Sequence, residues 1–338
     1  MRELQAREKP PTRGATCRAA LTPGDGCFVS AFDCSPCSSS PSWPATEGRF
    51  RPWAWTLLWA LCLLPASGWA AEEDQPRPAT REELTRYAWL PAQSVVRPLE
   101  AAVAPPEGYT RVPVVKGSFG AWLRGLPLRP DGTPVLSHQG GRILAAEDAR
   151  LAAVAELDVG TANLQQCADS VIRLHAEWLW ASGKRERLAY RFTSGHLAEW
   201  PRYAEGDRAR VSGSKVSWVR GAAPDASRAS FRAWLDLVFT YAGTHSLESL
   251  KGRPSREDVR PGDFFVLGGS PGHAVLVLDV AANAAGKRVA LLGQGFMPAQ
   301  DFHVLSAGGD TGPWFPLEGE DVVTPFWKPF PWSSLRRF

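Results

Sequence analysis

The stretch NLQQCADSVIRLHAEWLW, residues 163–180, predicts a long helix with a cysteine near its start. Asn163 is a residue type that caps helices, and we expect the helix to run to about Ala181. Apolar residues recur at helical spacing along the face that should be buried: Val171, Leu174, Trp178 and Leu179. Cys167 shares this face, because Val171 and Leu174 follow it at offsets of four and seven. His175 falls off the face and is expected to point to solvent.

The chain becomes β-rich after this helix and a second one. Four short apolar runs, divided by Gly, Pro and Asn, are typical of strands: DFFVL (263–267), HAVLVLDV (273–280), RVALLG (288–293) and DFHVL (301–305). We expect the first three to form a meander. The second helix is predicted from about Asp225 to Tyr241, after a looped region. The fold class is therefore α+β, with a central helix packed on an antiparallel sheet. The second helix is an insertion in the sequence between the central helix and the strands.

The segment before the central helix contains weaker signals. YTRVPVV (109–115) alternates like a strand, and SFGAWLRGL (118–126) is typical of a short helix capped by Ser118. LAAVAELDVG (151–160) again has strand character.

The N-terminal region is typical of an exported protein. Residues 49–71 combine two arginines, an apolar run from Trp53 to Leu64, and small residues ending at Ala71, which is the pattern of a secretory signal peptide. The apolar run is too short to span a bilayer, which takes about 20 residues. Residues 1–48 are rich in Pro, Ser and Cys and are interpreted as a non-native or disordered extension. We expect the mature protein to be soluble and periplasmic or extracellular, without stable membrane insertion.

The mature chain is expected to have three parts. Residues 72–105 form an N-terminal tether, residues 106–305 the α+β domain, and residues 306–338 a Pro- and Trp-rich tail packed over the surface. The formal net charge of the whole chain is +3, without a basic stripe, so nucleic acid is not an expected partner.

Signal cleavage would leave one cysteine. It removes Cys17, Cys27, Cys34, Cys37 and Cys62, so that Cys167 has no disulfide partner in an oxidising compartment. Two interpretations of Cys167 stay open: a small buried apolar residue, or a nucleophile at the positive end of a helix.

His273 and Gln294 are candidate partners of that thiol. His273 opens a strand after a glycine-rich loop, in RPGDFFVLGGSPGHAVLVLDV. The following strand returns through a turn near Asn283, which should place Gln294 opposite or nearly opposite His273.

The segments QCADSVIRL, PGDFFVL, PGHAVLVLD and LLGQ resemble the papain-like superfamily, especially the NlpC-type cell-wall peptidases. A longer part of the chain, about Tyr87 to Trp327, is similar to an uncharacterised family of exported bacterial proteins, domain of unknown function 4846. The similarity lies in GSFGAWLRGLPL, LQQCADSVIRL, FTSGH, FTYAGT, GGSPGHAV and FMPAQD.

The papain-like resemblance implies a cysteine hydrolase or acyl transferase. Cys167 would attack an amide carbonyl, His273 would take up the thiol proton, and Gln294 would fix the imidazole tautomer. The backbone N–H of Cys167, with Gln166 or Gln165, would bind the oxyanion. The sulfur must then lie within a few ångströms of the imidazole, across a cavity that a ligand can enter.

One residue argues against this chemistry, and two others have supporting roles at most. Asp169 follows Cys167 closely, and a negative charge there would raise the pKa of the thiol. His196, in FTSGH, is expected to line the cleft, and Ser194 lacks the GxSxG context of a serine nucleophile.

Metal and cofactor sites are not expected, because no HExxH or paired-histidine spacing occurs. The expected substrate is a cell-wall peptide or another amide or ester. Two alternatives stay open: a hydrolase of lipid or protein esters and amides, and a non-catalytic papain-like binding or scaffolding protein of the cell envelope with an inert thiol.

Overall fold

The computed structural model describes residues 75–338. The predicted extension (1–48) and the predicted signal peptide (49–71) lie outside the described residues. Within the described part, none of the helices has the length and hydropathy needed to cross a bilayer.

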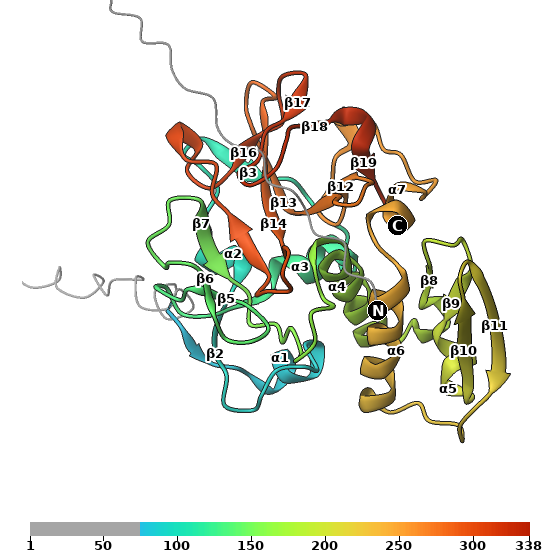
Figure 1. Cartoon of the computed structure of the whole chain (residues 1–338). Coiled ribbons are helices and arrows are strands. Elements are labelled where there is room, and N and C mark those ends of the chain that lie inside the picture. The colour runs from blue at the N-terminus through green and yellow to red at the C-terminus, as the bar shows by residue number, and fades with distance from the viewer. Residues whose placement is uncertain (1–74) are drawn as a thin grey trace, which may run out of the picture. The chain divides into compact units, whose positions relative to one another are not determined.

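An antiparallel sheet of eight strands forms the centre of the structure (Figure 1). Its main path is β19 (Leu335–Arg336), β12 (Phe264–Leu267), β13 (His273–Asn283), β14 (Arg288–Gln294), β15 (His303–Leu305) and β7 (Leu151–Val154). Two further strands pair off this path, β16 (Phe315–Pro316) with β14 and β3 (Tyr109–Arg111) with β13. The sheet confirms the predicted meander of β12, β13 and β14 and the α+β class.

Helix α4 (Cys167–Ala181) packs on one face of this sheet. Its Val171 and Leu174 belong to the same apolar cluster as Ala274 and Leu276 of β13. The intervening Val275 and Val277 belong to a second cluster, together with residues of the C-terminal segment. Because side chains alternate along a strand, β13 is buried on both faces, which explains its nearly continuous apolar sequence.

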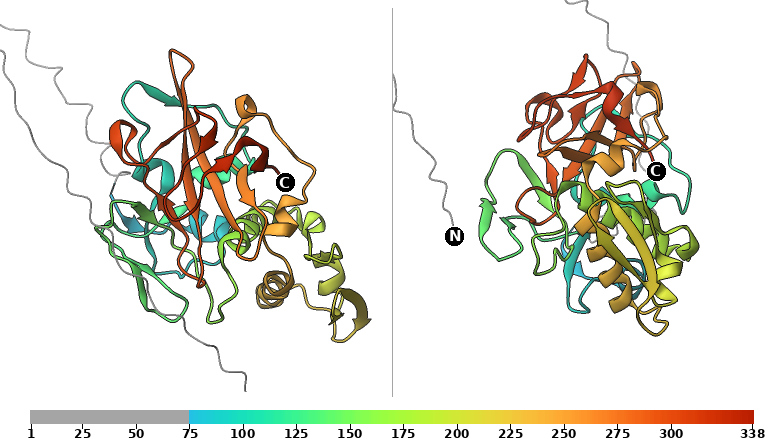
Figure 2. Two further views of the ribbon diagram at one scale, coloured as in Figure 1. Left: turned by 45° about the horizontal axis from the view of Figure 1, so that its top comes forward. Right: turned by 45° about the vertical axis from the view of Figure 1, so that its right-hand side comes forward.

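The region between α4 and β12 holds more structure than predicted. The expected loop consists of two hairpins and a short helix: β8 (Ala189–Arg191) with β9 (Leu197–Glu199), α5 (Trp200–Ala204), and β10 (Asp207–Ser212) with β11 (Lys215–Arg220). These elements lie together beside α6 (Figure 2). Helix α6 (Arg228–Tyr241) begins three residues later than predicted, because Ser227 and not Asp225 caps it. Helix α7 (Thr244–Glu248) then leads to β12.

A buried ion network joins α4 to α6. Arg173 and Glu177 of α4 are almost fully buried and form an ion pair of 2.8 Å. Glu177 also pairs with Arg228 at 2.8 Å, and Arg173 with Asp158 at 2.7 Å. Each buried charge therefore has an opposite charge beside it, which such burial requires.

The remaining short elements surround this core. They are β1 (Arg77–Pro78), α1 (Arg81–Arg86), β2 (Val95–Pro98), α2 (Leu99–Ala102), α3 (Phe119–Arg124), β4 (Pro127–Leu128), β5 (Val135–Leu136), β6 (Arg142–Leu144), β17 (Asp321–Val322) and β18 (Phe330–Pro331). Ser118 caps α3 as predicted, by accepting a hydrogen bond from the backbone of Ala121. The predicted strand 109–115 is shorter and ends at Arg111.

The segments interpreted as tether and tail contribute to the interior. Val96 and Leu99 of the first segment are buried in the main cluster. Trp314 and Phe330 of the second are fully buried, and β19 extends the sheet. The chain from residue 77 onward is thus built into the same α+β structure.

Candidate functional site

Cys167 is the first residue of α4, but Asn163 does not cap this helix. Gln166 occupies the N-cap position, and its backbone N–H donates to Asp169 Oδ2 at 3.1 Å. The Asn163 side chain instead accepts from the backbone of Ala299 at 2.7 Å and so ties the loop after β14 to the segment before α4. The sequence shows a suitable capping residue but not this competing long-range partner.

The thiol of Cys167 lies beside a small cavity. The side chain is 4 % exposed, and its Sγ donates to the carbonyl oxygen of Gly272 at 3.9 Å. The cavity has a volume of about 300 Å³ and is lined by the first turn of α4, the loop 269–272, Thr244 and Met297. Gly272 is required where the loop 269–272 packs on Thr244, because a Cβ there would lie 2.3 Å from Thr244 Oγ1.

His273 and Gln294 are brought together by the meander. His273 Nε2 and Gln294 Oε1 are 2.7 Å apart, and both residues are buried. The two do not lie directly opposite each other, since the register pairs Leu276 with Gly293. They share the face of the sheet that carries Val275, and the long glutamine side chain spans the diagonal.

A third side chain, His303 of β15, continues this hydrogen-bond chain. Gln294 Nε2 lies 3.3 Å from His303 Nε2, and His303 Nδ1 lies 3.1 Å from the carbonyl oxygen of Asp301. The carbonyl oxygen can only accept, so His303 Nδ1 must carry the ring proton and Nε2 must accept from the Gln294 amide. The Gln294 oxygen then faces His273 and accepts from Nε2–H. The chain leaves His273 Nδ1 without a proton.

This bare nitrogen has no hydrogen-bond partner among the described residues. Phe296 and Trp327 cover the imidazole, with ring centroids 4.8 and 5.0 Å away. A buried acceptor without a donor is costly, and such atoms mark places where a proton or a ligand is handled. His273 Nδ1 is thus in the chemical state of a general base.

The predicted contact between thiol and imidazole is absent. No hydrogen bond joins Cys167 to His273; the thiol donates to Gly272 O instead. Alternation along β13 explains the difference, because Ala274 faces α4 while the His273 ring leaves the strand on the other side. Thiol and imidazole therefore flank the backbone at residues 272–274, and only the thiol lines the cavity.

Burial controls the ionisation of these groups. It raises the pKa of the Cys167 thiol to about 11, although the backbone N–H of Ala274 acts in the opposite direction. Burial likewise lowers the pKa of His273 to about 4 and that of His303 to about 4. The resting thiol and both imidazoles are therefore neutral at pH 7.

Asp169 opposes ionisation of the Cys167 thiol less than its position in the sequence indicates. Burial raises the pKa of its carboxyl to about 8, so that it is mostly protonated at neutral pH. One of its oxygens, Oδ1, has no hydrogen-bond partner among the described residues. The charge that would oppose a thiolate is thus largely absent at pH 7.

Two of the proposed accessory residues lie elsewhere. The Gln165 side chain is fully buried and accepts from Arg173 at 2.9 Å, so it cannot reach an oxyanion. His196 is exposed beside the β8–β9 turn, bonded to Ser194 at 3.1 Å, and does not line the Cys167 cavity. Gln166 does line it, and its amide nitrogen bonds only to Asn163 at 3.2 Å. The backbone N–H of Cys167 and the Gln166 amide are the remaining oxyanion donors.

His303 was missed by the sequence analysis. It lies within DFHVL, which predicts a strand but gives no sign that β15 pairs with β14 so that Gln294 and His303 are partners in the register. The only available signal was a histidine inside an apolar strand, where a polar side chain needs a partner. Across the described residues, no group of three or more His, Cys, Asp and Glu side chains could hold a metal ion.

Comparison with known proteins gives one match. No curated protein and no solved structure matches the chain significantly. A family model described as a domain of unknown function (4846) matches residues 99–337, which include all the elements of the Cys167 cavity and of the His273, Gln294 and His303 chain. The chain therefore belongs to the family of domain of unknown function 4846.

Proposed function

We propose that this protein is a cysteine hydrolase or acyl transferase with a papain-like arrangement of helix and sheet. The observation that carries the proposal is the bare, buried Nδ1 of His273, whose other ring nitrogen is fixed by Gln294. The only cysteine of the described residues lies at a helix N-terminus against the peptide groups that flank this histidine. These are the parts from which a nucleophile and its base are built.

The reaction requires a rearrangement at the start of β13. Thiol and imidazole flank the backbone at residues 272–274, so this backbone must move as Sγ leaves Gly272 O before Sγ can reach His273 Nδ1. Nδ1 then takes the thiol proton, and the thiolate forms a bond to the carbonyl carbon of the substrate. The oxyanion accepts from the Cys167 N–H and the Gln166 amide, which the helix N-terminus favours. The imidazolium returns the proton to the leaving amine as the C–N bond breaks, and water or a second amine releases the acyl group.

The proposed substrate is an amide in cell-wall peptide. This substrate class rests on the resemblance to NlpC-type peptidases and on the expected export. A neutral group next to the scissile bond suits the cavity, because no Lys or Arg lines it and its Asp169 is mostly protonated at pH 7.

The test is the digestion of purified peptidoglycan with the wild type and with Cys167→Ala. New muropeptides with the wild type alone are expected. Equal profiles, combined with cleavage of lipid or protein esters or amides by the wild type only, would keep the chemistry and replace the substrate. Equal profiles with no cleavage of any of these substrates would contradict the proposal.

The competing proposal is a non-catalytic binding protein. It is favoured by the missing Cys167–His273 hydrogen bond and by the complete burial of the imidazole. In that case the Cys167 thiol stays neutral and unreactive in the folded protein. The rate of Cys167 alkylation measures this reactivity directly.

A further inference from the structure

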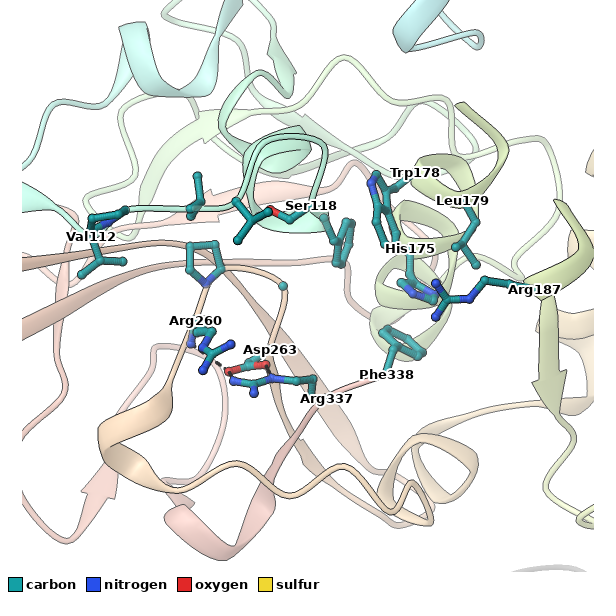
Figure 3. Close-up of a pocket in the computed structure, with 17 residues that line it drawn as sticks. Val112, Ser118, His175, Trp178, Leu179, Arg187, Arg260, Asp263, Arg337 and Phe338 are labelled. Carbon is teal, nitrogen blue, oxygen red and sulfur yellow. Dashed lines mark hydrogen bonds and ion pairs between the residues drawn. The ribbon is translucent and has the colours of Figure 1, made fainter. Parts of the chain in front are cut away.

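A second cavity lies along α4, away from the thiol. Its volume is about 400 Å³, and none of its lining residues is shared with the Cys167 cavity. His175, Trp178 and Leu179 of α4 form part of its wall, together with the loops 112–115 and 260–263 and the residues Arg337 and Phe338 (Figure 3). Trp178 lies eleven residues beyond Cys167, about 16 Å along the helix axis. The size is in the range of small-molecule sites.

One side of this cavity is aromatic. Phe119 and Trp178 have ring centroids 5.5 Å apart, and Phe119 meets His175 edge-on at 5.4 Å. Phe338 stacks on His175 at 3.9 Å with nearly parallel planes. The loop 112–115 adds Val112, Pro113, Val114 and Val115 on another side. The body of a ligand here must be apolar.

His175 does not point to solvent as expected. It is half-buried, and its Nδ1 lies 2.8 Å from the Tyr190 hydroxyl. Burial lowers the pKa of His175 to about 3 and raises the pKa of Tyr190, so both stay neutral at pH 7. Among the described residues the Tyr190 hydroxyl bonds only to His175 Nδ1; in the tautomer in which it donates to Nδ1, the ring proton lies on Nε2. That N–H has no acceptor among the described residues.

The charged side chains of the cavity differ in their pairing. Arg260 and Arg337 are both paired with Asp258, and Arg337 also with Asp263. The Arg187 side chain makes no hydrogen bond or ion pair in the part of the chain that the structure describes, and its charge acts on His175. Figure 3 shows its side chain reaching toward His175. The cavity thus offers two free donors, the Arg187 guanidinium and His175 Nε2–H.

We propose that this cavity binds a small amphiphilic carboxylate, with its apolar body against Phe119 and Trp178 and its carboxylate on Arg187 and His175. A carboxylate is acceptor-only and matches a guanidinium fork, whereas the Asp263 carboxylate that lines the cavity is already paired with Arg337. The site is independent of the Cys167 chemistry and adds a ligand to the protein.

The probe is sodium octanoate, titrated calorimetrically into the purified protein. We expect saturable binding to the wild type and to Cys167→Ala with equal affinity. Arg187→Gln should weaken it at least about tenfold, the size of a charge-assisted hydrogen bond. The matched control is Arg142→Gln, because Arg142 is also exposed and unpaired but lies on β6, away from the cavity; it should bind like the wild type.

Two further measurements locate the ligand. Octanamide, which lacks the charge, should bind at least about tenfold more weakly than octanoate. Val115→Asp should also weaken binding without lowering the melting temperature, because Val115 is 77 % exposed and its replacement disturbs no core packing. The proposal is overturned if octanoate gives no saturable heat, if octanamide binds equally well, or if Arg187→Gln and Arg142→Gln bind alike.

Discussion

At Cys167, burial and local polarity act on the thiol in opposite directions. The backbone N–H groups of Ala274 and Ala168 favour the thiolate, but desolvation outweighs them and raises the pKa to about 11. A thiol in this state is inert at neutral pH. Reactivity therefore depends on a proton acceptor. Both His273 Nδ1 and Asp169 Oδ1 lack a hydrogen-bond partner among the described residues, and we propose the imidazole for this role.

His303 determines the tautomer of His273 through the intervening side chain of Gln294. In His303→Ala the Gln294 amide loses its acceptor, so that the amide can turn and offer its NH₂ group to His273. The His273 proton then moves to Nδ1, and the base is lost. We expect the rate of Cys167 alkylation at pH 7 to fall about tenfold. The ring ¹⁵N chemical shifts of His273 should show protonation changing from Nε2 to Nδ1.

A merely structural role for His303 predicts another pattern. His303→Gln can again accept from Gln294 and should restore both the alkylation rate and the ¹⁵N shifts. Unchanged ¹⁵N shifts in His303→Ala would refute the polarity argument, even if the variant is less stable.

Among the elements, α4 was the most predictable from sequence. Its apolar period is long and regular, so its inward residues and its C-terminal end at Ala181 were predicted correctly, whereas the solvent-facing position of His175 was wrong. Its start was not, because Asn163 is occupied by Ala299, a contact across more than a hundred residues. The hairpins β8–β9 and β10–β11 were missed because their strands are short and mix polar with apolar residues, many of them only partly buried, which hides the alternation.

The ion network between α4 and α6 should be the main polar contribution to their docking. Glu177→Ala leaves Arg173 without its buried acid, with only the half-exposed Asp158 as a partner, and removes the partner of Arg228. We expect a loss of about 3–5 kcal/mol in the free energy of unfolding, measured by urea denaturation. The control is Asp236→Ala, which breaks the exposed pair with Arg232 and should cost less than about 1 kcal/mol. Equal losses in both variants would show that the buried network contributes no more to the free energy of unfolding than the pair of Arg232 and Asp236.

At the scale of the whole molecule, neutral burial of three histidines makes stability depend on pH. The pKa values of His273 and His303 are lowered to about 4 and that of His175 to about 3, while unfolded histidines titrate near 6.5. As pH falls from 6.5 to 4, the unfolded chain therefore takes up three protons that the folded chain does not. Asp169 acts oppositely, because its folded pKa is raised to about 8 and it keeps its proton when the unfolded chain loses it.

Stability should therefore fall below pH 6.5, with a net difference of about two protons, or roughly 3 kcal/mol per pH unit. It should also decline more gently between pH 6.5 and 8, where only Asp169 contributes. Urea denaturation from pH 4.5 to 8.5 measures both limbs. Asp169→Asn should flatten the alkaline limb and steepen the acidic limb to a difference of about three protons. A flat acidic limb would contradict neutral burial of the histidines.

The whole-molecule arrangement was predicted in part. The order of β12, β13 and β14 follows from short turns, so Gln294 could be brought near His273 by local rules. Which face of β13 the imidazole takes, and the cover provided by Trp327, depend on packing of the C-terminal segment. The C-terminal segment has no periodic sequence pattern, so its contacts with the imidazole could not be predicted from the sequence.

We propose that Cys167 is a nucleophile whose base is His273 Nδ1. The most direct measurement is the rate of iodoacetamide alkylation of Cys167 from pH 5 to 10, followed by peptide mass spectrometry in the wild type and in His273→Gln. The claim predicts fast alkylation of the folded wild type well below the usual thiol pKa of about 8.5, and a rate at least about tenfold lower in His273→Gln at pH 7. Equal rates in the two proteins, or labelling of Cys167 only after unfolding, would contradict it.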